Sequence, residues 1–312
     1  MPAHNSERIY DVLIVGAGPA GLSAALILGR IRRRVLVIDS REPRNAPSAR
    51  SHSFFTQDGT PPLELLRIGR EQLQPYDVEV LDAEVTDAFR EGDAFTVVLN
   101  DRRGGSRRSA RRILLATGVV DPLPEIEGLR ELWGRSVLHC AYCHGWEVRD
   151  QPLAVYANGG SAAEIVALVR CLSRDVVLCT DGPADLGDER ELLDRNGVPV
   201  REERIVRLEG RDGQLERIVF ADGTDLPRRA LFLPTLPRQH SGLAERLGCE
   251  LTAIGLVNVD ADGLTTVPGV YAAGDLALRR HQVVVASADG AIAGIAINHD
   301  LAWGDFGGGG HA

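Results

Sequence analysis

The sequence predicts an α/β protein built from two Rossmann-like dinucleotide-binding domains, the second inserted in the first. Three observations predict this fold. An apolar strand, a glycine-rich turn and a helix-like stretch follow one another from residue 10, and the same order recurs from residue 153. Two more short strands that end in small residues, at 113–118 and 269–275, lie on either side of the second unit.

The first turn has the pattern of a dinucleotide-binding site. An apolar strand leads directly into Gly16, Gly18 and Gly21. The first glycine permits a tight turn, the second lets the backbone approach a pyrophosphate, and the third lets the helix pack on the strand. The next apolar run, 35–38, ends in Asp39, where a carboxylate would accept hydrogen bonds from a ribose diol. Strand, turn, helix and acid therefore occur in the order that a nucleotide site requires.

Breaks in the pattern mark where the chain enters and leaves the second domain. The proline-rich segment 121–124 interrupts the first domain, and a polar break follows at 237–242. We expect residues 1–121 and 248–312 to form the first domain and residues 122–247 to form the inserted one.

The second glycine turn departs from the nucleotide-binding pattern. Ala157 occupies the first glycine position, Gly159 the second and Ala162 the third. A Cβ atom at the first position crowds the tight turn that a phosphate needs. After the next strand comes Asp181, which would repel the 2′-phosphate of NADPH where an arginine is wanted. We predict a Rossmann-like unit that has lost NADPH binding, with NADH as an alternative because Asp181 could bond an unphosphorylated ribose.

The inserted domain carries the motif Cys140-Ala-Tyr-Cys143-His144. Two thiols at this spacing can close a disulfide and pass two electrons to a partner, although a CxxC can also be half of a zinc site. No second CxxC or spaced histidine pair completes such a site, so we predict no metal. His144 places an imidazole beside the second thiol; the alternative is a helix-capping or solvent-facing histidine. His139, before the first thiol, is a weaker candidate.

Composition restricts the partners and the compartment. The net charge of −9 argues against nucleic acid as a partner, because binding phosphates needs clustered positive charge. No window approaches eighteen uninterrupted apolar residues, and the N-terminus is short and polar, so we expect no membrane span, no signal peptide and a cytoplasmic protein. In the reducing cytoplasm, a CxxC motif is more often catalytic than structural. We expect Cys171, Cys179 and Cys249 to be buried in the core.

The order of these motifs resembles that of the low-molecular-weight thioredoxin reductases over nearly the whole chain. The resemblance implies FAD/NAD(P)-binding domains of the three-layer ββα type, a bound FAD and a homodimer. It also implies that the polar loop at 44–62 lies beside the flavin ring. The FAD contacts that it implies are Gly16, Gly18, Pro19, Ala20, Gly21, Asp39, Ser40, Val85, Ala116, Thr117, Gly118, Gly274, Asp275, Gln282 and Val283.

Three departures from the reductases resemble the flavin-dependent dithiol oxidases, which close disulfides in natural products of the gliotoxin and holomycin type. His144 stands where reductases carry aspartate, Ala157 begins the altered glycine turn, and residues 180–182 replace a His-Arg-Arg cluster. The oxidases similarly have a Cys-x-x-Cys-His motif. We therefore predict an FAD-dependent dithiol oxidase with Cys140, Cys143 and His144 as catalytic residues.

The resemblance also assigns a role to each catalytic residue. Cys140 meets a small-molecule dithiol and Cys143 faces the flavin, with O2 as the electron acceptor and H2O2 as the product. His144 takes the proton of the attacking thiol, which suits a group whose pKa lies near neutrality. Three alternatives remain: a pyridine-nucleotide-dependent thioredoxin or peroxiredoxin reductase, a disulfide reductase supplied by ferredoxin or another protein, and a non-enzymatic flavin-binding redox sensor.

Overall fold

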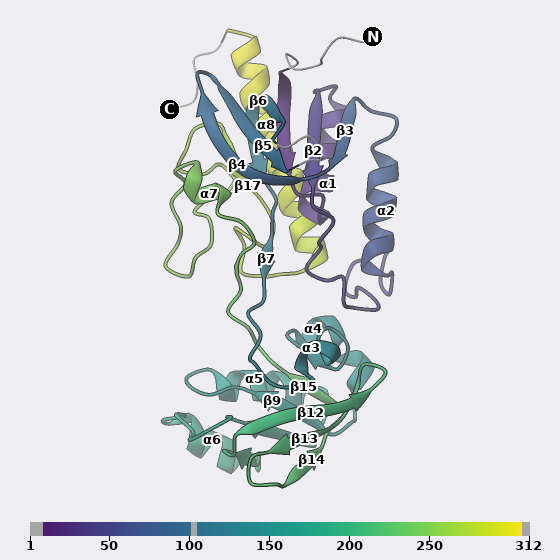
Figure 1. Cartoon of the computed structure of the whole chain (residues 1–312), viewed down its shortest axis with the longest axis vertical. Coiled ribbons are helices and arrows are strands. Elements are labelled where there is room, and N and C mark those ends of the chain that lie inside the picture. The colour runs from purple at the N-terminus through teal and green to yellow at the C-terminus, as the bar shows by residue number, and fades with distance from the viewer. Residues whose placement is uncertain (1–8, 101–104, 308–312) are drawn as a thin grey trace. The chain divides into compact units, whose positions relative to one another are not determined.

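The computed structural model describes residues 9–100 and 105–307 and divides into two compact units (Figure 1). Unit 1 comprises Met1–Ala46, Pro61–Val120 and Arg238–Ala312, and unit 2 comprises Pro47–Thr60 and Asp121–Pro237. The chain returns to unit 1 at Arg238, ten residues before the expected 248, because strand β16 (Arg238–Gln239) pairs antiparallel with β7 (Val119–Val120). Segment Pro47–Thr60, expected in the first domain, groups with unit 2 instead.

The core of unit 1 is a seven-stranded sheet in the order β3-β2-β1-β6-β5-β4, with β17 also paired to β6. Strands β1, β2, β3, β6 and β17 run parallel, whereas β4 and β5 continue from β6 as an antiparallel meander. The strands are β1 (Tyr10–Val15), β2 (Val35–Asp39), β3 (Val78–Asp82), β4 (Glu84–Glu91), β5 (Ala94–Asn100), β6 (Arg107–Leu115) and β17 (Val270–Ala272).

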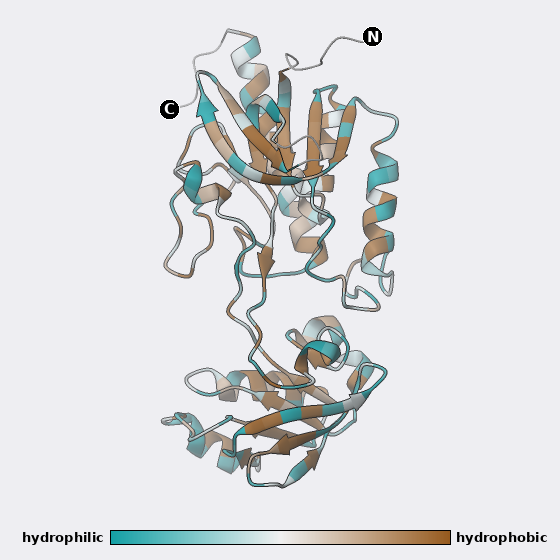
Figure 2. Cartoon of the chain, in the orientation of Figure 1, coloured by the Kyte–Doolittle hydropathy of each residue, from teal (hydrophilic) through white to brown (hydrophobic). Residues whose placement is uncertain are grey.

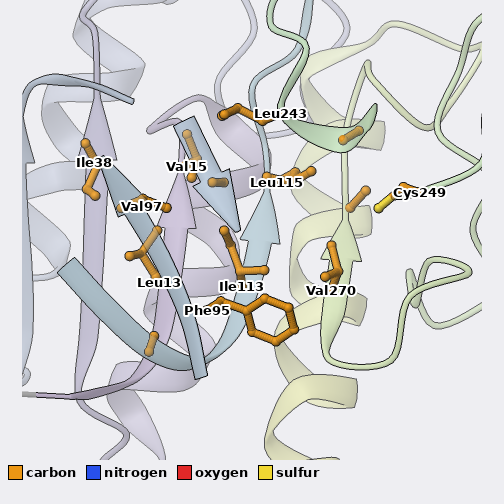
Figure 3. Close-up of a cluster of buried hydrophobic side chains, with 14 of the residues drawn as sticks. Leu13, Val15, Ile38, Phe95, Val97, Ile113, Leu115, Leu243, Cys249 and Val270 are labelled. Atoms are coloured by element: carbon orange, nitrogen blue, oxygen red, sulfur yellow. The ribbon is translucent and has the colours of Figure 1, made fainter. Parts of the chain in front are cut away.

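Both faces of the parallel sheet in unit 1 are buried. Because side chains alternate along a strand, Leu13 and Val15 of β1 pack against the meander residues Phe95 and Val97 (Figure 3). Val12 and its neighbours on the same face pack against helices instead. A strand that is buried on both faces has a nearly continuous run of apolar residues in its sequence. Figure 2 shows the central parallel strands as largely hydrophobic.

Helices cover the second face of this sheet. The order meander, sheet, helix confirms the predicted three-layer α/β fold, and in Figure 1 helices α1 and α8 lie together behind the strands. The helices of unit 1 are α1 (Pro19–Arg30), α2 (Pro62–Gln72), α7 (Leu243–Arg246) and α8 (Val283–Asp305).

Unit 2 repeats the same layers with a smaller parallel sheet, in the order β11-β10-β9-β15-β8. One face packs on helices α5 and α6, and the other packs on the antiparallel sheet β12-β13-β14. Its elements are α3 (Leu129–Leu132), β8 (Val137–Leu138), α4 (Ala141–His144), the 3-10 turn η1 (Trp146–Val148), β9 (Leu153–Tyr156), α5 (Ala162–Arg170), β10 (Val176–Cys179), α6 (Glu189–Arg195), β11 (Val200–Arg201), β12 (Ile205–Arg211), β13 (Gln214–Phe220), β14 (Asp225–Pro227) and β15 (Ala230–Phe232).

Within residues 9–100 and 105–307, no helix combines the length and the apolar composition that crossing a bilayer requires.

Candidate functional site

The two cysteines of the CxxC motif are joined in a disulfide in unit 2. Cys140 immediately precedes helix α4 and Cys143 lies within it, with Cα atoms 5.3 Å apart. The backbone N–H of Cys143 donates a hydrogen bond to Cys140 Sγ at 3.1 Å. Once the disulfide is reduced, this donor would stabilise a thiolate on Cys140 and so favour its reactive form.

His144 ends helix α4 and is largely enclosed. Its Nε2 lies 3.1 Å from the Oγ of Ser48, while its Nδ1 is buried and has no hydrogen-bond partner among the described residues. Burial lowers the pKa of His144 below its usual range, and the nearby Glu147 carboxylate opposes this effect. The imidazole is therefore neutral at neutral pH, in the state that accepts a proton.

His139 lies closer to the sulfur atoms than the sequence suggested. A ring nitrogen of His139 and the sulfurs of Cys140 and Cys143 are all within 4.8 Å of one another. The ring also lies beside Trp133, with centroids 5.9 Å apart. Three such ligands in the reduced protein would resemble part of a zinc site, but in the structure the sulfurs are bonded to each other. We assign no metal here.

Part of the loop 44–62, which is expected beside the flavin ring, packs against the redox motif. Besides the Ser48 contact, Ser53 Oγ donates to the carbonyl of Tyr142 at 3.3 Å. His52 Nε2 lies 3.3 Å from Glu147 Oε1, just beyond α4. These polar contacts explain why the loop groups with unit 2, and sequence alone gave no sign of them.

Aromatic side chains flank the disulfide without joining the core. Tyr142, between the cysteines, is 71% exposed, and Trp146 is 68% exposed. The Arg149 guanidinium lies 3.9 Å from the centre of the Trp146 ring, which holds that ring by a cation–π contact. The two aromatics are thus presented to solvent beside the thiols.

The residues predicted to contact FAD gather at one edge of the unit 1 sheet. Parallel strands end at the same edge, so the segments after β1, β2, β6 and β17 come together there. Val85 lies three residues after the end of β3, and Gln282 and Val283 begin α8. The residues that directly follow the four strand ends are Gly16, Gly18, Pro19, Ala20, Gly21, Ser40, Ala116, Thr117, Gly118, Gly274 and Asp275, and Asp39 is the last residue of β2.

The first glycine turn leaves room for an anion. Gly16 has φ +106°, and a Cβ on it would lie 2.3 Å from the carbonyl oxygen of Ala116. A Cβ on Gly21 would lie 1.9 Å from the oxygen of Gly16. A Cβ on Gly18 would meet no heavy atom of the described residues within 4 Å apart from its chain neighbours, so there is open space on that side of Gly18. Gly18 also precedes helix α1, whose N-terminus has no side-chain cap in the described structure.

The two predicted acidic contacts have partners within unit 1. Asp39 accepts a hydrogen bond from the backbone N–H of Ala17 at 3.1 Å and forms an ion pair with Arg70. Asp275 forms an ion pair with Arg44 at 3.0 Å, and the same guanidinium lies 2.9 Å from His281 Nδ1. Arg44 and Arg70 thus contact two predicted site residues, and the sequence did not single them out because the chain carries many similar arginines.

Acidic side chains of the protein bind two backbone N–H groups near the second glycine turn, although a Cβ on Gly159 or Gly160 would meet no heavy atom of the described residues within 4 Å. The Glu189 carboxylate, from α6, accepts a hydrogen bond from the backbone N–H of Ala163 at 3.2 Å, in the first turn of α5. One oxygen of Asp181 accepts from the N–H of Ile205 at 2.6 Å, and the other accepts from the hydroxyl of Tyr156 at 3.0 Å. Burial, followed by this hydrogen bond, raises the pKa of Tyr156 to about 12.

The remaining cysteines lie away from the disulfide motif. Cys179 and Cys249 are buried as expected, and burial raises the pKa of Cys179 to about 12, which keeps its thiol protonated. The expectation for Cys171 is wrong: it is exposed, because it follows the end of the amphipathic helix α5 on the solvent side.

Comparisons with known proteins match almost the whole chain. A family model described as pyridine nucleotide-disulphide oxidoreductase matches residues 10–290. The thioredoxin reductase tcpT of Claviceps purpurea is 33% identical over 301 residues, covering 93% of this chain and 94% of that protein. The crystal structure of HlmI superposes with a TM-score of 0.91 at 40% identity, covering 98% of this chain and 96% of HlmI. For the thioredoxin reductase of Streptococcus pyogenes MGAS5005 the TM-score is 0.86 at 26% identity, covering 96% and 99%.

Proposed function

Because this chain belongs to the pyridine nucleotide-disulphide oxidoreductase family, we propose that it is an FAD-dependent dithiol oxidase. It closes a disulfide in a small-molecule dithiol through Cys140 and Cys143. The net reaction is R(SH)2 + O2 → R(S–S) + H2O2, so the substrate loses two electrons and two protons and oxygen gains both. The observation that carries the proposal is the second glycine turn, whose helix N-terminus is already bonded to Glu189.

The residues of unit 1 fit a bound FAD. The open space beside Gly18 and the uncapped N-terminus of α1 suit a pyrophosphate, since backbone N–H groups and the helix dipole favour an anion there. Asp39 would accept from a ribose hydroxyl through a lone pair that its contacts with Ala17 and Arg70 leave unused. When bound, FAD would supply the two-electron acceptor that links thiol oxidation to O2.

Contacts at the second glycine turn argue against the binding of NADPH or NADH. A pyrophosphate would have to displace the Glu189 carboxylate, and like charges would repel. A ribose diol would compete with the two hydrogen bonds that Asp181 already accepts. Both the NADPH and the NADH alternatives are therefore disfavoured by contacts within unit 2.

The redox motif supplies the thiol chemistry. The substrate thiolate attacks Cys140 Sγ, and the Cys140–Cys143 bond breaks, leaving a thiolate on Cys143. The second substrate thiol then attacks the mixed disulfide and releases the product and Cys140. His144, neutral because burial lowers its pKa, accepts a proton from an attacking thiol. The exposed rings of Tyr142 and Trp146 suit a small apolar dithiol at this surface.

A second candidate is a thioredoxin or other disulfide reductase, which the names of tcpT and the Streptococcus pyogenes relative favour. A reductase supplied by ferredoxin or another protein donor is a third. In each of these the electrons run from the flavin to the cysteines. We place the oxidase in the cytoplasm, as the sequence composition suggests, and expect a homodimer, as the resemblance implies.

An anaerobic titration of the yellow protein separates these candidates. We expect no bleaching of the flavin absorbance by NADPH or NADH, rapid bleaching by dithiothreitol, and recovery on admitting air. Bleaching by either nucleotide at low concentration would return the protein to the reductases. If neither the nucleotides nor dithiothreitol bleaches the flavin, a protein electron donor becomes the leading candidate.

A further inference from the structure

A segment from outside the inserted domain reaches the redox histidine. Segment Pro47–Thr60 connects two elements of unit 1 in sequence, yet it groups with unit 2. Through this segment Ser48 Oγ lies 3.1 Å from His144 Nε2, although the two residues are 96 positions apart. The contact fixes one edge of the imidazole ring of His144, the residue that follows Cys143 in the chain.

The contact decides which ring nitrogen carries the proton. A neutral imidazole has one N–H and one lone pair, and His144 Nδ1 is buried with no hydrogen-bond partner among the described residues. If Nδ1 carried the hydrogen, a buried donor would lack an acceptor, which native structures rarely tolerate. If Nε2 carries it, Ser48 Oγ accepts the hydrogen bond and Nδ1 keeps only a lone pair.

We propose that Ser48 is a positioning residue for His144, accepting Nε2–H and so presenting Nδ1 as the proton-accepting atom of the redox site. The inference rests on the proposed function, in which His144 accepts a thiol proton. The proton leaves the sulfur of the attacking thiol and binds Nδ1. The thiolate electron pair forms the new S–S bond to Cys140, and the Cys140–Cys143 bond breaks and leaves its electron pair on the Cys143 thiolate. A hydroxyl oxygen accepts from Nε2–H before and after that transfer, so Ser48 need not rearrange.

Other charged groups around His144 act through space without holding the ring. Glu147 raises its pKa and His52 lowers it, both by Coulombic interaction. His52 itself lies against Glu147 and Asp58. Of the contacts to the His144 ring within residues 9–100 and 105–307, the Ser48 hydroxyl is the one at hydrogen-bonding distance.

The tautomer of His144 is the direct test, and it does not depend on activity. Nitrogen NMR of the oxidised holoprotein labelled with 15N-histidine distinguishes Nδ1–H from Nε2–H, and a His144→Gln variant assigns the signals. We expect the Nε2–H tautomer in the wild type and a mixture in Ser48→Ala. Ser51→Ala is the matched control, because the buried Ser51 hydroxyl in the same segment has no hydrogen-bond partner in the described structure. Nδ1–H in the wild type, or no change in Ser48→Ala, would overturn the assignment.

The kinetic test compares rates of flavin bleaching by dithiothreitol without oxygen. We expect Ser48→Ala to bleach about tenfold more slowly at neutral pH, with a displaced pH profile, because the base is no longer fixed in the reactive tautomer. Ser48→Thr keeps the hydroxyl and should recover the wild-type profile, as should Ser51→Ala. Equal profiles for Ser48→Ala and the wild type would refute the positioning role. If dithiothreitol bleaches no variant, the oxidase proposal fails while the tautomer result still decides the role of Ser48.

Discussion

The carboxylate of Glu189 accepts a hydrogen bond from the backbone N–H of Ala163, in the first turn of α5. In a nucleotide-binding unit that turn is where an anionic pyrophosphate would bind. The equivalent turn of unit 1, after Gly18, has no side-chain cap in the described structure and opens on free space. The two turns therefore differ in this acidic contact at the helix N-terminus, while Gly159 of the second turn, like Gly18 of the first, has open space where a Cβ would lie.

The Glu189 contact should contribute to folding. We expect Glu189→Ala to lower the free energy of unfolding by about 1 kcal/mol, as the loss of a helix N-cap typically does. Glu189→Gln should lose less, because an amide oxygen still accepts the hydrogen bond. Urea denaturation measures both, with Glu191→Ala as a control, since the exposed Glu191 carboxylate forms a weak ion pair with Arg195, at 3.8 Å, on the same helix. Equal stability of Glu189→Ala and the wild type would mean that the carboxylate does not act as a cap.

Substitutions at Gly18 and Gly21 should have different effects, the first on flavin binding and the second on folding. A Cβ on Gly18 meets no atom, whereas a Cβ on Gly21 would overlap the carbonyl of Gly16. We expect Gly18→Ala to fold but to purify with little flavin, because the new methyl group fills the anion space. Gly21→Ala should be destabilised even without cofactor. The ratio of flavin to protein absorbance, together with thermal melting of the apoproteins, measures the two effects. Full flavin content in Gly18→Ala would place the anion elsewhere.

Local patterns made most of the fold predictable from sequence. Apolar runs became the parallel strands, and Gly16, Gly18 and Gly21 lie where β1 ends and α1 begins, an order that neighbouring residues already show. The contact that excludes a side chain at Gly16, with the Ala116 carbonyl, is not local. The CxxC disulfide was predictable for the same reason, since both thiols lie within one turn of helix.

Contacts between distant segments were not predictable in this way. Ser48 meets His144 across 96 positions, and Glu189 meets Ala163 across 26, through single polar side chains that leave no periodic signal. The return of the chain at Arg238 depends on a two-residue strand, too short to show alternation. The residues that distinguish this site are thus the ones that tertiary packing brings together.

The two cysteines should differ in how readily each forms a mixed disulfide with an added disulfide. In Cys143→Ser, the thiol of Cys140 remains and should form a stable mixed disulfide with a linear disulfide such as 2-hydroxyethyl disulfide, whose released thiol leaves the protein and has no ring to close. Mass spectrometry of the intact chain would show the adduct. Cys140→Ser should form much less of it, and neither variant should bleach when dithiothreitol is added. Adducts of equal yield on the two variants would contradict the role of Cys140 as the outer thiol.

Acid should destabilise the protein through His144. Because burial lowers the folded-state pKa of His144, the unfolded chain binds a proton at higher pH than the folded one. The stability that the neutral ring contributes is complete above the unfolded pKa of about 6.5 and is lost as the pH falls through the lower folded value. We expect His144→Gln to lose less stability than the wild type on acidification below about pH 6.5, in urea denaturation of the oxidised holoprotein. If the free energy of unfolding falls with pH in the same way for both proteins, the folded and unfolded states bind the His144 proton equally well.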